Sequence, residues 1–538
     1  MNMNKYTVPL SNTATTLDII DTIGRSEMSD IEAYIGYTDE DIAGIEADFE
    51  NNTFTRLAGA IGKSGGSDFN SFPTYAGMRR CNLSDSGVVN AYYGDNNFIE
   101  DGSNGQVMVE IPRFYYKVVP LKLQKQDWSD YGAVAWTSGT SYAVGKVVTY
   151  NGAYYACITA NSDAEFTPAK WHEIEELGLM GYHLLKARYY VSATPKDGFK
   201  VHPAFIDKTT GNLRDYVYIG AYGGIAYDVS AGAYLLNDEQ VIDTTATTGD
   251  KLSSIGGTYE RSYTYYDKAT DTDVTITVNA GAKPCSGQTS NNTLTRANAT
   301  KMAHNRGTGW EQQTIEIVSA IQLLCAIEYC SFNWQTVIGS GIVSISDNGK
   351  ENCASFVSST SSLGNTSGNA TATIDYTGTP RNTSGTQSIS YRGIEDFFGN
   401  IWKWVEGINI YGIYNNNGGQ PFYCTDGVYT ESVSGNNYVS VGFTVANTSS
   451  YVKYFGYSTE DWDWLFLTSK VGDGASTAVP VGDITYVTSC LNGYRVAYLG
   501  GTWNFIPAYA GGYCWALSNA PSSYNRIIGC RLAYLPSA

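Results

Sequence analysis

Side chains that could bind a metal or act as nucleophiles are scattered along this sequence. The four histidines, His172, His183, His202 and His304, include no pair at metal-ligand or catalytic-triad spacing. The ten cysteines form no C-x-x-C pair, and without an export signal they are better explained as buried thiols than as disulfides. We therefore expect neither a metal centre nor a cofactor.

The acidic residues offer candidates for acid–base chemistry but no motif. Cleavage of a sugar chain needs two carboxylates across a cleft. Glu395, Asp396 and Glu406 lie in an aromatic stretch, where turn formation or hydrogen bonding explains them better than catalysis. GAIGKS at 59–64 resembles the end of a phosphate-binding loop, but Leu57 stands where its first glycine belongs. We predict no catalytic residue and no enzymatic activity.

The most distinctive stretch is the C-terminal segment Leu499–Leu532, LGGTWNFIPAYAGGYCWALSNAPSSYNRIIGCRL. It places tryptophan, tyrosine and phenylalanine between glycines and small polar residues, a mixture that favours neither a helix nor a long strand. Aromatic rings lose little rotamer entropy on contact, and Ser, Gly and Asn adapt their hydrogen bonds, so such mixtures are typical of recognition surfaces. We interpret the segment as a binding face.

Length and composition limit the class of protein. A chain of 538 residues suggests two to four domains, and 43 Tyr and 57 Gly with only 16% charged residues indicate short strands and turns, in an all-β or loop-rich α+β protein. A net charge of -18 argues against a nucleic-acid partner. No stretch reaches the ~20 apolar residues of a membrane span, and the N-terminus lacks a secretory signal, so we expect synthesis and folding in the cytosol.

Several segments can be placed along the chain. Residues 1–51 are polar and acidic; their charges fit a solvated helix face better than a docking surface. Strand-like runs start at Val107 and Gly181 and could pair as a hairpin, with residues 128–175 inserted at its tip. Helical spacing of apolar residues predicts a buried helix over about 311–329.

The insert resembles the small chitin- and cellulose-binding modules of bacterial chitinases. The resemblance rests on Ala135, Trp136, Tyr142, Gly145, Val148, Tyr150, Gly152, Tyr155, Pro168 and Trp171. In that family the sugar stacks mainly on an exposed aromatic pair just after the second tyrosine, where this chain has Ala156, Cys157, Ile158 and Thr159. Without that platform, we favour a spacer or docking role over sugar binding.

Three further segments share a second resemblance. FFGNIWKWVEG (397–407), GYRVAYLGGTW (493–503) and NRIIGCRLAY (525–534) are similar to the C-type-lectin-like fold of formylglycine-generating enzymes and of the variable proteins of diversity-generating retroelements. Upstream pieces, among them IPRFYYKV and GFKVHPAFI, resemble bacteriophage tail proteins that carry this domain. The resemblance implies an α+β, C-type-lectin-like fold with short strands and loops, a small all-β insert and an N-terminal attachment segment.

Within this resemblance, residues of about 499–532 correspond to a variable region with an invariant frame. The frame would be Gly500, Gly501, Trp503, Trp515, Gly529 and Arg531. The mutable, ligand-contacting positions would be Thr502, Asn504, Phe505, Ile506, Tyr509, Ala516, Ser518, Tyr524 and Ile527. Glycine and tryptophan can pin a long loop to the core while neighbouring side chains vary; we expect both tryptophans to be buried.

The resemblance implies a phage tail-fibre or tail-tip adhesin, carried on the virion and assembled in the host cytoplasm. Its partners would be a bacterial surface receptor, glycan or protein, and other tail proteins, in a homotrimer without nucleic-acid binding or membrane insertion. One alternative is an enzyme: a polysaccharide depolymerase, or a formylglycine-type oxidase holding copper on Cys514 and Cys530, which are sixteen residues apart in sequence. The other is a structural baseplate protein without its own ligand.

These interpretations give a domain division. It comprises an attachment segment (1–51), the first part of the lectin-like domain (52–127), the inserted module (128–175) and the remainder of the lectin-like domain (176–538).

Overall fold

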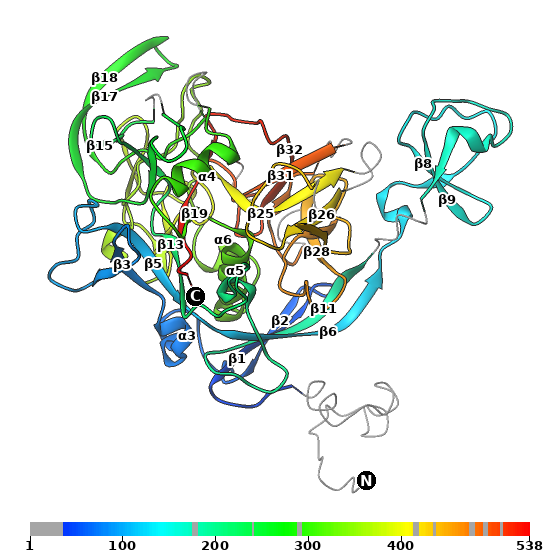
Figure 1. The fold of residues 1–538 in the computed structure, drawn as a ribbon, viewed down its shortest axis with the longest axis horizontal. Coiled ribbons are helices and arrows are strands. Elements are labelled where there is room, and N and C mark those ends of the chain that lie inside the picture. The colour runs from blue at the N-terminus through cyan, green and yellow to red at the C-terminus, as the bar shows by residue number, and fades with distance from the viewer. Residues whose placement is uncertain are drawn as a thin grey trace, which may run out of the picture.

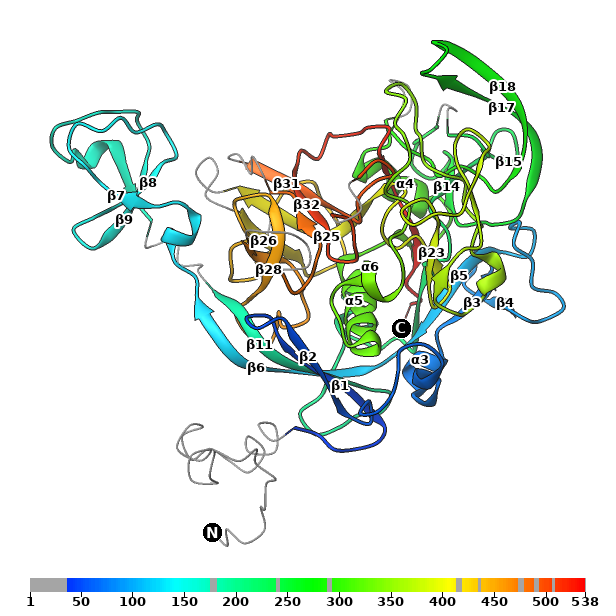
Figure 2. The ribbon, with the colours of Figure 1, turned by 180° about the vertical axis from the view of Figure 1, so that it is seen from behind.

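The computed structural model describes residues 36–174, 181–238, 242–287, 293–412, 419–433, 437–472, 479–487, 493–505 and 509–537. Statements about the structure below refer to these residues. Ile506 and residues 1–35 of the predicted attachment segment lie outside them. Figures 1 and 2 show the chain from front and back.

The first large sheet has the strand order β12-β6-β11-β1-β2, and β28, with β29 and β30, joins it at β11. Its strands are β1 (Ile42–Asp48), β2 (Thr53–Ala58), β6 (Tyr115–Lys125), β11 (Tyr182–Ser192), β12 (Lys200–Val201), β28 (Ser450–Tyr457), β29 (Thr468–Gly472) and β30 (Ile484–Thr485). β6 and β11 are antiparallel from Tyr115–Ser192 to Lys125–Tyr182. The predicted pairing is confirmed for the second half of the run that starts at Val107, whereas its first half, Gln106–Pro112, forms a strand of the second sheet.

A second sheet runs β19-β34-β13-β5-β3-β4 and brings the C-terminal strand beside strands from the first half of the chain. Its strands are β3 (Arg79–Leu83), β4 (Val89–Tyr92), β5 (Gln106–Pro112), β13 (Tyr216–Gly220), β19 (Trp310–Gln312) and β34 (Leu532–Tyr534).

A third sheet, in the order β27-β26-β25-β31-β32, contains the strands at the start and in the middle of the C-terminal segment. It contains β25 (Trp402–Gly412), β26 (Gly419–Cys424), β27 (Tyr438–Ser440), β31 (Gly493–Leu499) and β32 (Trp515–Asn519), with β33 (Ile528–Gly529) parallel to β25. The long β25 therefore anchors both ends of the predicted variable region.

Smaller sheets fill the remainder of the body. They are β14 (Ile225–Asp228), β15 (Ala233–Tyr234) and β16 (Lys251–Ser253); the hairpin β17 (Tyr259–Asp267) and β18 (Thr272–Ala280); β20 (Gly368–Asn369), β23 (Ile389–Tyr391) and β24 (Ile394–Glu395); and β21 (Thr373–Ile374) and β22 (Pro380–Arg381).

The prediction of an α+β fold is wrong, because the described chain is predominantly β. The described residues form 34 strands and four α-helices, which are α3 (Pro73–Ala76), α4 (Arg296–His304), α5 (Ile315–Tyr329) and α6 (Trp334–Val337). Two of them are single turns. The α+β assignment came from the family resemblance, whereas the Tyr- and Gly-rich composition, which favours strands and turns, also allowed an all-β protein.

The helix α5 lies at the centre of the body (Figure 1) and is buried on its whole circumference, as predicted. It starts at Ile315 rather than near Glu311, because Trp310–Gln312 pair with β34 as strand β19. It ends at Cys330, which has the left-handed φ of 53° typical of a helix C-terminus. The main hydrophobic core packs around this helix.

The insert folds as a separate four-stranded sheet, β10-β9-β8-β7. Its strands are β7 (Val134–Ala135), β8 (Val147–Tyr150), β9 (Ala153–Cys157) and β10 (Trp171–Glu173), with hydrophobic clusters of their own. Figures 1 and 2 show that β6 and β11 extend beyond the body as an arm and carry the insert away from it. At the base of the arm Asp130 pairs with Lys470, at 2.8 Å, and with His183, at 3.1 Å.

The predicted helix face in the acidic run of the N-terminal segment is also wrong. Residues 42–48 form β1, which lies between β2 and β11 in the first sheet. Glu46 pairs with Lys186 and Arg188 on the neighbouring strand, each at 2.8 Å. The acidic side chains thus alternate along a strand and meet cross-strand cations, a long-range pairing that charge spacing alone does not reveal.

Candidate functional site

The C-terminal segment turns sharply after β31. Gly500 and Gly501 have φ values of 105° and 82°, which favour glycine. A Cβ on Gly501 would lie 2.9 Å from the Cβ of Ala510. The chain therefore needs glycine here both for its backbone conformation and for close approach of the returning loop.

The residues predicted to form the frame are all buried. Trp503 and Trp515 have no exposed surface, and the indole of Trp515 donates a hydrogen bond to the carbonyl oxygen of Phe466 at 2.9 Å. The buried Arg531 guanidinium donates to the carbonyl oxygens of Gly220, Glu395 and Asp396 at 2.5–2.9 Å. The prediction that both tryptophans belong to the core is confirmed.

The predicted contact residues occupy different environments. Asn504 and Tyr524 are exposed, and Phe505, Tyr509, Ser518 and Ile527 are partly exposed. Thr502 and Ala516, in contrast, are buried at 3% and 2% exposure, so they offer no surface to a ligand in this conformation. The Thr502 hydroxyl donates to the Asn400 carbonyl oxygen at 3.4 Å. Ala516 packs in a hydrophobic cluster, and Trp515, Ala516 and Leu517 of β32 are all buried, so both faces of the strand are covered there.

An aromatic cluster lies beneath the partly exposed positions. The Phe505 ring is 5.3 Å from Trp402, 5.4 Å from Tyr486 and 6.2 Å from Tyr509, and Tyr509 in turn meets Tyr451 at 5.6 Å. Phe505 thus combines a packing role with a partly exposed edge. Replacing it would disturb the body as well as the surface.

An ion pair that sequence reasoning missed fixes the exposed loops. Arg526 holds Asp347 through two nitrogen–oxygen contacts of 2.6 and 2.8 Å, and the Asn504 amide donates to the same carboxylate at 3.1 Å. Burial alone would raise the pKa of Asp347, but the hydrogen bonds and charge of Arg526 hold it below its usual value. Nothing in the local sequence connects residues 179 positions apart.

The insert presents an aromatic cluster centred on Phe166. Its ring stacks on Tyr150 at 4.0 Å and meets Trp136, Tyr155 and Trp171 at 4.9–5.8 Å. All of these rings except the buried Trp171 are partly exposed. The position expected for a sugar-binding platform was just after Tyr155, and Phe166 was not predicted to contribute to one.

The stretch after Tyr155 offers little of the platform that the family uses. Ala156 and Cys157 are buried, whereas Ile158 and Thr159 are exposed. The partly exposed rings of the insert therefore lie elsewhere, around Phe166.

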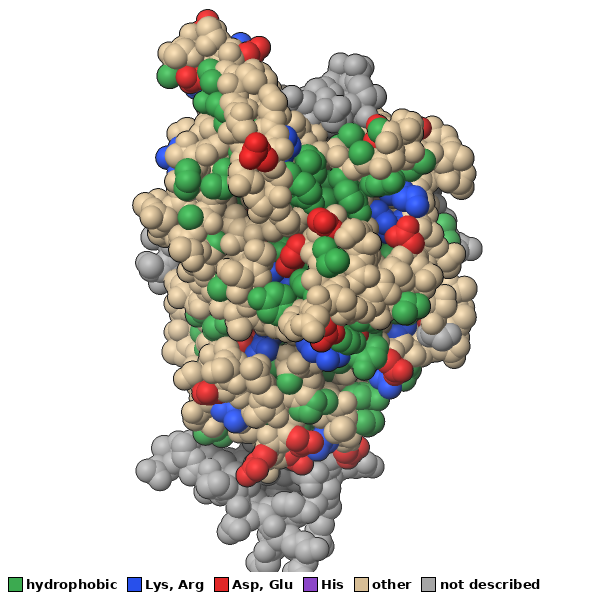
Figure 3. Space-filling view, turned by 90° about the vertical axis from the view of Figure 1, so that its left-hand side faces the viewer, with side chains coloured by type: hydrophobic (Ala, Val, Ile, Leu, Met, Phe, Trp, Pro, Cys, Tyr) green, Lys and Arg blue, Asp and Glu red, His purple; other side chains and the backbone are tan. Residues whose placement is uncertain are grey.

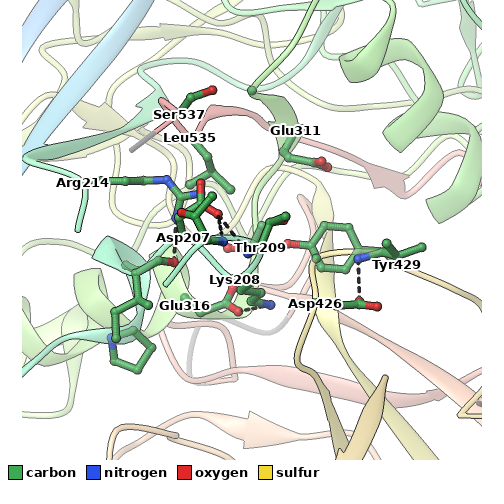
Figure 4. Close-up of a pocket in the computed structure, with 18 of the residues that line it drawn as sticks. Asp207, Lys208, Thr209, Arg214, Glu311, Glu316, Asp426, Tyr429, Leu535 and Ser537 are labelled. Carbon is green, nitrogen blue, oxygen red and sulfur yellow. Dashed lines mark hydrogen bonds and ion pairs between the residues drawn. The ribbon is translucent and has the colours of Figure 1, made fainter. Parts of the chain in front are cut away.

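A cleft of about 430 Å³ lies between the loop after Pro203–Phe205, the start of α5 and the 426–429 loop (Figure 4). Its charges are engaged with one another: Asp207 with Arg214 at 2.8 Å, and Glu316 with Lys208 at 2.5 Å. The Asp426 carboxylate accepts the backbone N–H of Val428 at 2.8 Å. Such pairing favours a structural role for these acids.

Two further groups of this region form a pair at the edge of the cleft. His304 Nε2 lies 2.6 Å from Glu311 Oε1. The contact with Glu311 raises the pKa of His304, and burial raises that of Glu311.

The other carboxylates considered for catalysis are also committed to the core. Glu395 accepts hydrogen bonds from the backbone N–H groups of Ser358 and Thr360, at 2.8 and 2.7 Å. Burial raises the pKa of Glu395 to about 7. Glu406 accepts from the Thr300 hydroxyl at 2.6 Å. Each acid lies inside the body rather than across a cleft.

The cysteines do not form the copper pair of the enzyme alternative. Cys530 Sγ lies 3.8 Å from Cys285 Sγ, and both are buried in the same cluster as Cys514. The described cysteines are free thiols, buried except for the half-buried Cys330, as predicted. Within the described ranges, no group of three or more His, Cys, Asp or Glu side chains is placed to hold a metal ion.

Comparison with known proteins supports one of the two resemblances. Residues 135–172 match carbohydrate-binding module family 5/12, which covers most of the insert. No curated protein matches the chain. A solved structure described as "Major Tropism Determinant M1 Variant" aligns over 93% of this chain and 95% of its own, at 12% identity and a TM-score of 0.21, which is too low to establish a shared fold.

No helix in the described part of the chain is long and apolar enough to cross a membrane.

Proposed function

We propose that this chain is a receptor-binding adhesin of a bacteriophage tail that attaches to a glycan on the bacterial surface. The observation that carries the proposal is the insert: a module matching a carbohydrate-binding family, folded separately and held away from the body on the arm of β6 and β11. Insertion at a hairpin tip exposes a module while leaving the body intact.

The partly exposed cluster around Phe166 supplies the surface for sugar binding. Tyr150 and Phe166 are stacked, and Trp136 lies edge-on to both, at 5.4 and 5.8 Å. Aromatic faces bind the apolar faces of sugar rings, and their partial burial limits the entropy lost on contact. This proposal replaces the spacer role favoured by the missing platform at 156–159.

The C-terminal segment supplies a second contact surface in this proposal. Its members are the exposed Asn504 and Tyr524 with the partly exposed Phe505, Tyr509, Ser518 and Ile527. The Arg526–Asp347 pair holds this surface in place, so side chains there can vary while the frame beneath stays fixed.

Binding of the purified chain to intact bacteria and to chitin and cellulose tests the proposal. We expect Tyr150→Ala to reduce retention on polysaccharide by about tenfold, because it removes one stacked ring. The double variant Asn504→Ala/Tyr524→Ala should instead reduce binding to cells.

The matched control is Tyr216→Ala in β13. Tyr216 is 41% exposed, close to the 42% of Tyr524. This variant should bind like the parent. If neither cells nor polysaccharide retain the parent chain, the adhesin proposal fails and a structural role in the tail replaces it. Release of sugar ends from the polysaccharide would favour the enzyme alternative.

A further inference from the structure

A second cavity, of about 610 Å³, is lined by elements that Figure 1 shows on the side of the body away from the insert. It is open to solvent and is bordered by the turn after β3, strand β4, the loop before β5, strands β14, β15 and β16, the start of β17 and the segment after α4. Figure 3 looks onto this side of the molecule, where acidic and basic side chains are scattered over a largely uncharged surface. Neither the predicted C-terminal face nor the insert contributes to it.

Three tyrosines line the cavity. The rings of Tyr227 and Tyr234 meet edge to face at 5.0 Å, and Tyr259 is the third. All three are partly exposed, so each buries one part of its ring and presents another to the cavity. This arrangement offers apolar ring surface beside hydroxyl groups.

Polar side chains complete the wall with both donors and acceptors. The Asn104 amide nitrogen donates to the Asn97 carbonyl oxygen at 2.8 Å, and among the described residues no hydrogen bond is made by its Oδ1 or by the Tyr227 hydroxyl. Lys251 lies 3.4 Å from Asp85, whose other oxygen is held by Arg306 at 2.5 Å. Lys251 therefore retains ammonium protons for a ligand.

Glycines let the loop before β5 approach these rings closely. A Cβ on Gly102, whose φ is 84°, would lie 2.3 Å from the Tyr234 hydroxyl. At Gly105, with a φ of 114°, a Cβ would lie 2.6 Å from the Leu83 carbonyl oxygen. The loop that carries Asn104 is thus fixed against the cavity wall, which lowers the ordering cost of binding.

We propose that this cavity is a saccharide-binding site, separate from the insert and from the C-terminal face. Tyr227 and Tyr234 would contact the apolar face of a sugar ring, while Asn104 accepts from its hydroxyl groups and Lys251 donates to them. A polyhydroxyl ligand matches this wall because each hydroxyl both donates and accepts.

Other ligand classes fit the wall less well. The cavity is lined by the acids Asp85 and Asp101 as well as by Lys251 and Arg306. A multiply charged anion such as phosphate would therefore be repelled by the two carboxylates as well as attracted by the two cations. A mainly apolar ligand would leave the charged and amide groups of the wall without hydrogen bonds.

Saturation-transfer NMR on the full chain tests this site. The probes are glucose, galactose, N-acetylglucosamine and glucuronic acid, since a single sugar contact commonly has a Kd of about 1 mM. The background is Tyr150→Ala/Asn504→Ala/Tyr524→Ala, which weakens the two surfaces of the proposed adhesin, so that binding at the cavity is detected as the part that Tyr227→Ala removes. We expect at least one probe to bind this background, and Tyr227→Ala or Asn104→Ala added to it to weaken binding about tenfold.

Tyr216→Ala added to the same background is the matched control and should leave the affinity unchanged. Circular dichroism melting of every variant establishes that each is folded. The proposal is overturned if no probe binds the background protein, or if a folded Tyr227→Ala variant binds as the background does. Neither outcome contradicts the adhesin proposal, which depends on the two surfaces weakened in this background and is tested with the parent chain.

Discussion

At the scale of single residues, the C-terminal segment separates into two sets of side chains. Trp503, Trp515 and Arg531 are buried and tied to the body, whereas Asn504 and Tyr524 reach solvent. Substitution of the first set removes core packing or leaves buried polar groups without partners, both of which are costly. The second set can change with little effect on stability.

This division predicts how the segment varies if a retroelement diversifies it. Sequencing of a propagated population should show an excess of substitutions at Asn504, Tyr509 and Tyr524 but not at Trp503 or Trp515. Thr502 and Ala516 are a sharper test, because their burial predicts selection against most replacements. Equal substitution frequencies at the buried and the exposed positions would contradict the division into two sets. If no position of the segment shows an excess of substitutions, diversification by a retroelement is contradicted.

The single residue His202 is expected to make the stability of the fold depend on pH. It is fully buried among the rings of Phe114, Tyr116 and Trp464, and its Nδ1 accepts from the Ala204 N–H. Burial, with a smaller effect from Lys200, lowers its pKa from 6.5 to about 3. The unfolded chain therefore binds a proton that the folded chain excludes, and stability falls as the pH drops below about 6.5.

The variant His202→Asn keeps an acceptor for the Ala204 N–H but cannot titrate. Between about pH 7 and about pH 5, we expect its free energy of unfolding to fall by about 2 kcal/mol less than that of the parent. Urea unfolding at several pH values measures the difference. Burial raises the pKa of nearby Asp463 to about 6, an opposite contribution that both proteins share. Equal acid sensitivity of the two proteins would show that His202 is protonated when folded.

At the scale of elements, the arm decides how the insert is presented. The last pair of its ladder joins Lys125 to Tyr182, and the Gln126 N–H donates to the Gly181 carbonyl oxygen at 2.9 Å. Gln126 is also fixed to the body, because its amide nitrogen donates to the Thr444 carbonyl oxygen at 2.7 Å. The hairpin is therefore complete without the insert.

Replacing residues 127–180 with an Asn-Gly turn should leave the body folded, because such two-residue turns close antiparallel strands. We expect the melting temperature to fall by only a few degrees, owing to loss of the Asp130 contacts with Lys470 and His183. Calorimetry of the shortened chain measures the change. The variant Asp130→Asn in the full-length chain serves as a control for those contacts. Failure of the shortened chain to fold would show that the insert is part of the body.

At the scale of the whole molecule, the surfaces proposed for binding lie on separate parts of the chain. The insert extends from one side of the body, and the elements that line the tyrosine-lined cavity lie on the opposite side (Figure 1). Linked weak sites can gain about 10²–10⁴-fold in overall affinity when they engage together. A tail adhesin that carries several copies of the chain would increase the overall affinity further.

We propose the homotrimer that the family resemblance implies, which sedimentation equilibrium tests directly. The expected mass is three times the 58.5 kDa of the chain. Retention on cells should then depend on the assembly, since dilution to monomers removes the gain from linked sites. A monomer at micromolar concentration that still binds cells tightly would contradict the need for a trimer.

The sequence by itself determined the features that depend on local pattern. Runs rich in β-branched and aromatic residues specified the strands of the arm, helical spacing specified α5, and the spacing of aromatics and glycines located the insert and the burial of Trp503 and Trp515. Each of these features depends on residues within about twenty positions of one another in the chain, so each can be predicted from the local sequence.

Only the tertiary structure decided what distant segments build together. The predominance of strands, the burial of Thr502 and Ala516, the Arg526–Asp347 pair and the tyrosine-lined cavity all depend on segments far apart in the chain. Which side chains face solvent is set by the packing of sheets on α5, and local periodicity does not encode that packing. The C-terminal segment alone therefore revealed an aromatic surface, and the fold selected which of its residues remain on it.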